Sequence, residues 1–156
     1  MHPQKVEKKQ VLQRPGELDS KIYVVKSGLL RSYTIDEKGK EHVFMFAPEG
    51  WVIADNVPPE QPTTLFIDAL EDSLVDVRKK DIKSEHQNAA PLVRRLYVLQ
   101  KRVLMLMSAS AIERFKDFVA TYPDIIQRVP QRMIASYLGI TPEALSKLKR
   151  EQLQSS

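Results

Sequence analysis

The stretch VPQRMIASYLGITPEALSKLKR, residues 129–150, constrains the fold more than any other part of the chain. It predicts two short helices joined by a tight turn, because Gly139 can end the first helix in the left-handed conformation and Thr141 can cap the second. Pro142 then takes the first helical position, where its missing N–H is no loss. The apolar positions of the two helices are Ile134, Ala135, Leu138, Leu145 and Leu148. This is the pattern of a helix-turn-helix, whose second helix enters the major groove of DNA.

The exposed face of the second predicted helix carries polar side chains that form one stripe at spacings of three and four residues. Glu143, Ser146 and Lys147 suit base edges, because a carboxylate accepts from cytosine, a cation donates to guanine and a hydroxyl suits either. Side chains at the start of the first helix usually reach phosphates. The candidate DNA-binding residues are therefore Gln131, Arg132, Thr141, Glu143, Ser146, Lys147 and Arg150. The alternative is an ordinary helical hairpin with a solvated charged face.

The charge of the chain is divided unevenly along its length. Residues 1–90 carry 13 Lys and Arg against 15 Asp and Glu, a net charge of −2. Residues 91–156 carry 11 against 5, a net charge of +6. A basic half that contains the helix-turn-helix is what a nucleic-acid-binding module requires, so the charge favours DNA binding over a plain hairpin.

The composition excludes several classes of protein. The 156 residues include no cysteine, which rules out disulfides, thiolate metal sites and cysteine-ligated iron–sulfur clusters. No apolar run approaches the ~18 residues that a membrane span needs. The first ten residues lack the apolar core of a signal peptide. We therefore expect a cytoplasmic protein without membrane contact.

Short strands separated by turns are predicted over the first half of the chain. Pro15-Gly16 and Ser27-Gly28 mark turns, and the polar, proline-rich residues 56–63 form a loop. The predicted strands are Val11–Arg14, Ile22–Val25, Leu29–Ile35, Glu41–Phe46, Trp51–Ile53, Thr64–Ala69 and Leu74–Val77. Short strands at this spacing are typical of a sandwich or barrel, and the simplest interpretation is a jelly-roll-like antiparallel β domain.

A helix is predicted without interruption from about Pro91 to about Tyr122. Within it, apolar residues recur at alternating spacings of four and three, which forms an a/d seam over nearly three heptads. The candidate dimer-interface residues of this seam are Leu92, Leu96, Leu99, Val103, Leu106 and Ser110. The alternative is a single amphipathic helix on its own β domain, because Tyr97 and its apolar neighbours widen the face. We interpret one side as packing on the domain and the seam as meeting a second copy.

This order of a β domain, a seam helix and a helix-turn-helix resembles the Crp/Fnr family of bacterial transcription regulators. Residues 24–55 and 69–82 resemble the strands of its cyclic-nucleotide-binding fold, and residues 108–151 resemble its DNA-binding part. The resemblance covers about residues 10–151 and implies an α+β protein. Its expected parts are a jelly-roll-like β-roll (double-stranded β-helix) sensor domain at 1–90, a dimerisation helix at 91–113 and a helix-turn-helix domain at 114–156.

The function that the resemblance implies is a homodimeric, sequence-specific regulator that binds double-stranded DNA at an inverted repeat. RNA polymerase is a further candidate partner, and neither a cofactor nor enzyme activity is expected. Family members usually carry a helical segment before the first strand, but only about ten residues precede Val11 here. Little chain follows the second helix, so the resemblance implies a short or trimmed member with little room for a wing.

The ligand cassette departs from that of nucleotide-binding relatives, which carry Gly-Glu after the glycine-rich turn and Arg-Ser/Thr-Ala after the loop. Ala54-Asp55 stands in the first place and Thr63-Thr64-Leu65 in the second, so Thr63 replaces the arginine that pairs with the cyclic phosphate. Losing that contact costs about 2–3 kcal/mol, or about thirty- to a hundredfold in affinity. The candidate effector pocket is therefore Ala54, Asp55, Thr63 and Thr64, and we expect no cAMP binding. A cyclic-nucleotide-responsive regulator with an atypical pocket is the alternative.

Two rival functions have weaker support. A cupin-like metalloenzyme needs two or three histidines with a carboxylate on facing strands, but the histidines are His2, His42 and His86. Only Glu41 and His42 fall on a predicted strand, where adjacent residues point to opposite faces. A sensor or adaptor that keeps the β domain without binding DNA conflicts with the basic stripe.

Overall fold

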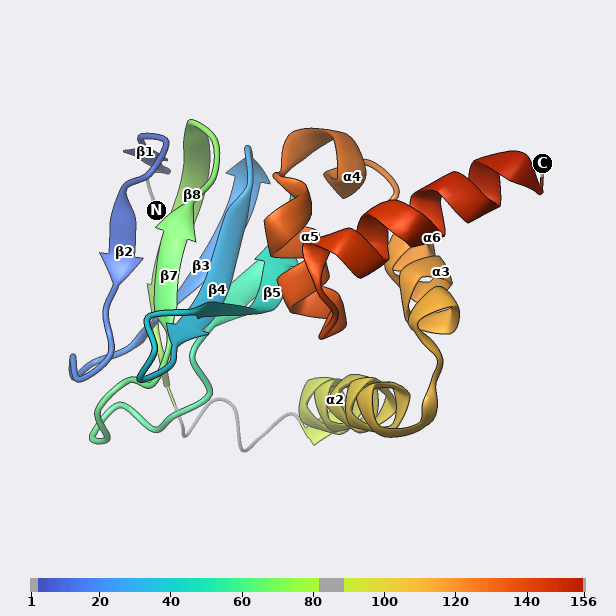
Figure 1. Ribbon diagram of the computed structural model, residues 1–156. Coiled ribbons are helices and arrows are strands. Elements are labelled where there is room, and N and C mark those ends of the chain that lie inside the picture. Colours follow the sequence, from blue (N-terminus) through green and yellow to red (C-terminus); the bar gives the residue numbers. More distant parts are fainter. Residues whose placement is uncertain (1–2, 82–88, 156) are drawn as a thin grey trace. The chain divides into compact units, whose positions relative to one another are not determined.

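The computed structural model describes residues 3–81 and 89–155, which belong to two compact units, residues 1–83 and 84–156 (Figure 1). The first unit is a sandwich of two four-stranded antiparallel sheets, with strand orders β1-β8-β3-β6 and β2-β7-β4-β5. The strands are β1 (Gln4–Val6), β2 (Val11–Gln13), β3 (Lys21–Ser27), β4 (Leu30–Ile35), β5 (Glu41–Ala47), β6 (Val52–Ala54), β7 (Phe66–Ala69) and β8 (Ser73–Lys79).

The expected jelly-roll-like β domain is confirmed, because each predicted strand is present with its ends shifted by at most two residues. Strand β1 was not predicted. It exists by pairing with β8, where Lys5 lies opposite Leu74, almost seventy residues further along the chain. A strand of three residues with no apolar alternation has no local signal of its own.

The core of the sandwich lies between its two sheets. Val25 and Val75 come from one sheet, Leu30 and Ile67 from the other, and Ile53 from the edge strand β6; all five are fully buried. Removing each such side chain from water contributes about 1.5–3 kcal/mol to the free energy of folding. Alternation of apolar and polar residues along the strands therefore positions the sheets face to face.

A bidentate ion pair links neighbouring strands of the second sheet. Arg31 Nε and Nη2 donate to the Oδ1 and Oδ2 atoms of Asp68 at 2.9 and 3.0 Å, and Nη1 donates to Glu41 Oε2 at 2.6 Å. Burial lowers the pKa of Arg31, but the hydrogen bonds to Asp68 and Glu41 have the larger combined effect, so the pKa is raised. Asp68 therefore has a structural partner on β4.

In the described part of the second unit, residues 89–155, all regular structure is helical. Its helices are α2 (Ala89–Ser108), α3 (Ala111–Thr121), α4 (Ile125–Arg128), α5 (Gln131–Leu138) and α6 (Pro142–Gln154). Phe115, Phe118, Ile125, Ile134 and Leu145 form its buried core. No helix in the described part of the chain combines the length and apolar character that crossing a membrane requires.

The prediction of one uninterrupted helix from Pro91 to Tyr122 is wrong. Helix α2 ends at Ser108, and Ser110 caps α3 by accepting a hydrogen bond from the N–H of Glu113 at 3.4 Å. Glu113 in turn accepts from the Ser110 N–H at 2.7 Å, and this bond holds the pKa of Glu113 below its usual range. Such a capping box starts a new helix, so the expected helix end at residue 113 lies inside α3.

The first testable prediction concerns Gly28, which has φ +89° in the turn between β3 and β4. A Cβ atom there would lie 2.7 Å from the carbonyl oxygen of Asp72. We expect Gly28→Ala to lower the free energy of unfolding by about 2 kcal/mol or more, because backbone strain and steric overlap add. Urea unfolding followed by the fluorescence of Trp51, the one tryptophan of the chain, measures this change.

Gly16→Ala is the matched control, because Gly16 has φ +90° and open space around its Cβ position. We expect this variant to lose only about 1 kcal/mol, which is the cost of the left-handed backbone alone. Equal losses in the two variants would mean that the Asp72 carbonyl does not restrict residue 28.

Candidate functional site

The helix-turn-helix predicted from the sequence is present as α5 and α6. Gly139 ends α5 with φ +68° and ψ +34°, which is the left-handed conformation. The hydroxyl of Thr141 accepts a hydrogen bond from the N–H of Ala144 at 3.2 Å, and Pro142 is the first residue of α6. The predicted packing positions Ile134, Ala135, Leu138 and Leu145 are buried, and Leu148 is half-buried.

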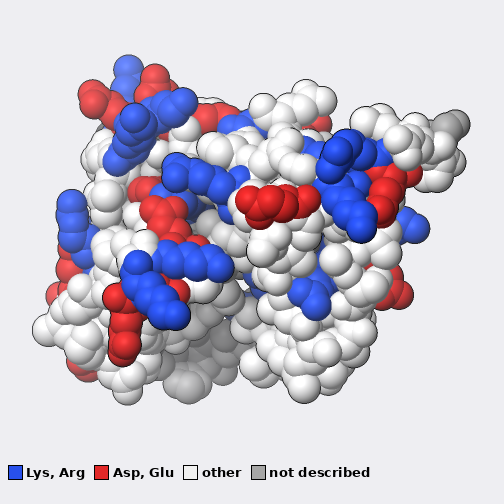
Figure 2. Space-filling view, in the orientation of Figure 1, with Lys and Arg blue, Asp and Glu red and all other residues white. Residues whose placement is uncertain are grey.

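The predicted polar stripe lies on the surface of α6. Glu143, Lys147 and Arg150 are exposed there, and Ser146 between them is half-buried. Figure 2 shows Lys and Arg atoms gathered over α6, with acidic atoms on either side. A surface of mixed charge on a helix of thirteen residues can present both donors and acceptors to base edges.

The structure brings two of the candidate residues together. Ser146 on α6 donates a hydrogen bond to Gln131 Oε1 at the start of α5, at 3.3 Å. Arg132 is exposed next to Gln131. Lys147 Nζ lies 3.8 Å from Glu151 Oε1, but both side chains are more than half exposed, so this pair holds Lys147 only weakly.

The last four carbonyl groups of α5 have no partner within the helix, as at the end of any helix. The turn that follows supplies two donors. The N–H of Ile140 donates to the Ala135 oxygen at 3.0 Å, and the N–H of Gly139 donates to the Ser136 oxygen at 3.2 Å. Two carbonyl groups, those of Tyr137 and Leu138, must therefore find donors elsewhere.

Arginines on two other helices supply those donors. Arg102 Nη2 on α2 donates to the Tyr137 oxygen at 3.0 Å, and Arg114 Nη1 on α3 donates to the Leu138 oxygen at 3.0 Å. The Arg114 Nε also donates to the Ala109 oxygen, at 3.1 Å, in the link between α2 and α3. Cations at the carboxyl end of a helix also interact favourably with its dipole. All four terminal carbonyl groups of α5 are thereby satisfied.

Sequence reasoning missed Arg102 and Arg114, although a weak signal for each exists. Arg102 falls between Leu99 and Leu106 on the predicted seam, at spacings of three and four. Arg114 precedes Phe118 by four residues on the apolar face of α3. A cation on the core side of an amphipathic helix indicates a buried acceptor, but the sequence does not say which one.

Helix α2 carries an apolar surface, but the predicted seam is not uniformly exposed. Leu96 and Val103 are 66% and 53% exposed, whereas Leu99 is half-buried. The side chain of Leu92 lies outside the described residues, and Ser110 lies beyond the end of α2. The exposed apolar residues on this side of α2 are Val93, Leu96, Tyr97, Val103, Leu104 and Met107, which we call the α2 stripe.

The predicted effector-pocket residue Asp55 is buried and fully engaged with its own chain. Its Oδ2 accepts from the N–H groups of Thr64 and Leu65 at 2.6 and 2.8 Å. The Thr64 hydroxyl also donates to Asp55, at 3.1 Å. The carboxylate therefore takes the donors that the second part of the cassette would otherwise offer to an anionic ligand.

Thr63 and Lys80 fix the two ends of the same loop. The Thr63 hydroxyl donates to the Arg14 oxygen at 2.6 Å and accepts from the Glu17 N–H at 3.1 Å. Lys80 Nζ donates to the backbone carbonyl oxygen of Val57 at 2.7 Å and also to the backbone carbonyl oxygen of Asp55. Ala54 ends β6 and is buried. The four predicted pocket residues thus serve the internal structure of the β unit.

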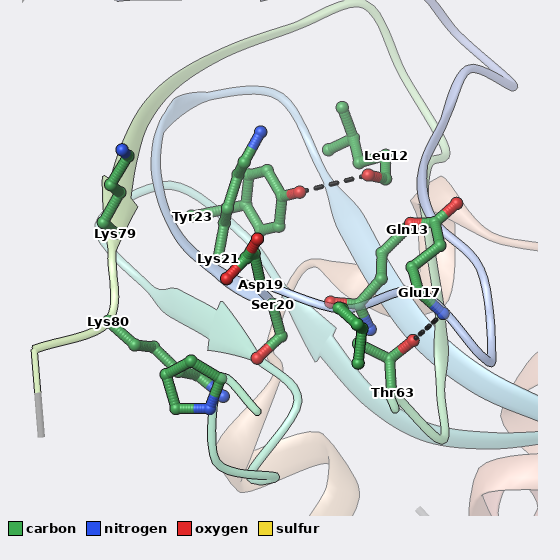
Figure 3. Close-up of a pocket in the computed structure, with 12 residues that line it drawn as sticks. Leu12, Gln13, Glu17, Asp19, Ser20, Lys21, Tyr23, Thr63, Lys79 and Lys80 are labelled. Carbon is green, nitrogen blue, oxygen red and sulfur yellow. Dashed lines mark hydrogen bonds between the residues drawn. The ribbon is translucent and has the colours of Figure 1, made fainter. Parts of the chain in front are cut away.

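A cavity of about 410 Å³ opens beside Thr63, which is the one predicted pocket residue in its lining. Figure 3 shows Gln13, Ser20 and Tyr23 converging on it from β2, the following loop and β3. The Tyr23 hydroxyl donates to the Leu12 oxygen at 3.1 Å, and burial followed by the charge of Glu17 raises the pKa of Tyr23 to about 12. The cavity is therefore lined by both polar and apolar groups, and it lies to one side of the predicted cassette.

The histidine considered for a metal site, His42, lies near the start of β5. His42 Nε2 is 2.8 Å from Asp36 Oδ2, and Asp36 also accepts from the N–H groups of Lys38 and Lys40. Its hydrogen bond with His42 and those from the two backbone groups lower the pKa of Asp36. Within residues 3–81 and 89–155, no group of three or more His, Asp or Glu side chains could hold a metal ion.

Comparisons with known proteins agree with this architecture. No family model matches the chain. The anaerobic regulatory protein of Haemophilus influenzae is 26% identical over an alignment of 163 positions, gaps included. The alignment covers 92% of this chain and 63% of that protein. The regulatory protein HlyX of Actinobacillus pleuropneumoniae is 27% identical, over 92% of this chain and 68% of that protein. The chain thus spans less than two thirds of the Haemophilus relative.

Solved structures of regulators share the fold. FixK2 from Bradyrhizobium japonicum matches with a TM-score of 0.82 and 21% identity, over 98% of this chain and 84% of that chain. A transcriptional regulator of the CRP/FNR family from Thermus thermophilus matches with a TM-score of 0.72 and 17% identity, over 99% and 87%. The chain is thus similar in sequence to curated regulatory proteins and in fold to solved regulators, one of which is described as a member of the CRP/FNR family.

Proposed function

We propose that this protein is a homodimeric, sequence-specific DNA-binding transcriptional regulator whose β unit does not bind cAMP. The observation that carries the proposal is the capped turn at Gly139 and Thr141, which presents α6 with a stripe of exposed Glu143, Lys147 and Arg150. Double-stranded DNA with an inverted repeat is the proposed partner, RNA polymerase is a further candidate partner, and the cytoplasm is the proposed location. Selection of bound genomic fragments by the purified protein tests the proposal directly.

The α2 stripe supports dimerisation. A helix that exposes Leu96, Tyr97, Val103 and Met107 in a single chain presents a contiguous apolar surface, and such surfaces commonly bind a partner. A second copy of α2 is the partner that a near-heptad repeat favours. Two-fold symmetry then sets two copies of α6 about 34 Å apart, one turn of duplex.

The occupied donors around Asp55 support the absence of cAMP binding. A cyclic phosphate needs a cation and backbone donors, yet Thr63 replaces the arginine and Asp55 accepts from the Thr64 and Leu65 N–H groups. A phosphate in the same place would meet the negative charge of Asp55. The proposed β unit therefore retains the fold of a nucleotide sensor without its anion site.

The second testable prediction separates base reading from phosphate binding. Lys147→Ala and Glu143→Ala should each relax the preference at one base pair per half-site, by about 1–3 kcal/mol, because α6 residues read base edges. Arg132→Ala should weaken all sequences about equally and reduce the salt slope by roughly one unit, because it removes a phosphate contact. Binding curves on duplexes with single base changes, at several salt concentrations, measure both effects.

Lys38→Ala, on the exposed hairpin of the β unit, is the control for the loss of one positive charge. It should change neither base preference nor salt slope. A Lys147→Ala protein with unchanged preference and a reduced slope would move Lys147 into the phosphate-binding group, and base reading would then depend on Glu143 and Ser146.

The third prediction concerns the dimer. Replacing Leu96 and Val103 by Lys should give a monomer in sedimentation, because two charges in the α2 stripe must be buried to form the interface. Val98→Lys is the control, since Val98 is also exposed on α2 but lies on the opposite face of the helix. A stable dimer in the double variant, or a monomer in the control, would place the interface elsewhere.

The fourth prediction concerns the effector cassette. Calorimetry with cAMP should detect no binding at micromolar concentrations, because the lost arginine contact alone costs about thirty- to a hundredfold in affinity. Titration with 5′-AMP under the same conditions controls for non-specific binding of a phosphate. A micromolar dissociation constant for cAMP but not for 5′-AMP would show that another cation reaches the phosphate.

A further inference from the structure

We propose that Arg102 is a positioning residue for DNA reading: from α2 it fixes the end of α5, and thereby the direction in which α6 is presented. The inference rests on the proposed function, because it assumes that α6 reads DNA. Arg102 lies on α2, the proposed dimerisation helix, and its position between seam residues does not by itself suggest a role in DNA reading. Arg102 acts through Tyr137 and the turn and does not itself touch DNA.

Two kinds of contact join Arg102 to α5. Its guanidinium lies over the ring of Tyr137, 3.6 Å from the ring centroid, and its Nη2 donates to the Tyr137 carbonyl oxygen at 3.0 Å. One side chain therefore holds both the backbone and the ring of the same residue. Arginine suits this task, because its planar group can stack and donate at once, whereas lysine provides a point charge without a flat face.

The Tyr137 ring is also held by α3. Its centroid lies 5.4 Å from that of Phe118 and 5.7 Å from that of Tyr122, the latter in an edge-on arrangement. Phe118 and Tyr122 belong to the buried core of the helical unit. The ring is therefore fixed between the core and Arg102, and a change at Arg102 acts on a residue that has few alternative positions.

The end of α5 determines where α6 begins, because only residues 139–141 separate the two helices. Helix α2 contacts this turn at a second point, since Leu106 Cδ2 lies 3.6 Å from the position that a Cβ on Gly139 would occupy. Arg102 and Leu106 are four residues apart and so lie on one face of α2. That face touches the DNA-reading pair of helices, whereas the α2 stripe remains available for a second copy.

Three variants test the inference. Arg102→Ala removes both contacts, Arg102→Lys keeps the charge, and Arg94→Ala removes the same group from an exposed position two turns earlier in α2. The first measurement is the affinity for the duplex that the wild-type protein selects from a random pool, together with its salt dependence. The second is hydrogen exchange of the Gly139 and Ile140 amides, which donate to the end of α5. Sedimentation and thermal melts followed by circular dichroism confirm that each variant is a folded dimer.

We expect Arg102→Ala to raise the dissociation constant by about tenfold or more, the equivalent of ~1.4 kcal/mol. The salt slope should stay unchanged, because no phosphate contact is lost. Exchange of the Gly139 and Ile140 amides should accelerate, Arg102→Lys should recover part of both losses, and Arg94→Ala should match the wild type. Such a pattern requires a folded dimer with a displaced turn.

Two results would overturn the inference. Unchanged affinity and unchanged exchange in Arg102→Ala would show that the turn does not depend on Arg102. A loss of affinity with a salt slope lower by about one unit would make Arg102 a direct phosphate contact. If the wild-type protein selects no duplex, the proposed function fails, and the exchange measurement still decides whether Arg102 holds the turn.

Discussion

The ends of helices need donors for their last carbonyl groups, and the arrangement of the helical unit depends on how α5 meets that need. A turn of three residues is too short to supply all four donors. Arg102 and Arg114 supply the remaining two from separate helices, so three helices meet at one point. Each bond involves a charged donor in a partly buried place, where such bonds are stronger than neutral ones. Helix α6 begins at Pro142, and only residues 139–141 separate it from this end of α5.

Much of the fold follows from local sequence signals. Gly139 and Thr141 predicted the turn correctly because a left-handed position and a helix cap depend on a few neighbouring residues. The break at Ser110 was missed because the apolar period continues across it, although the Ser-x-x-Glu pattern of a capping box is present. Strand β1 was missed because its existence depends on β8, far away in the chain.

In the candidate site, too, some features could be predicted from local sequence and others could not. Helical spacing alone places Glu143, Lys147 and Arg150 on one exposed face, and the structure agrees. The role of Arg102 could not be predicted, because it depends on which carbonyl lies within reach once the helices have packed. Asp55 was identified as an altered cassette residue, but its hydrogen bonds to the following loop are a property of the folded β unit.

The link between α2 and α3 has a mechanical consequence. Only residues 109 and 110 separate the two helices. Arg114 on α3 donates from Nε to the Ala109 oxygen in this link and from Nη1 to the Leu138 oxygen, while Arg102 on α2 donates to the Tyr137 oxygen at the same end of α5. The two arginines therefore join α2 and α3 to one end of α5. We therefore expect a rotation of α2 to move the end of α5, and with it the start of α6.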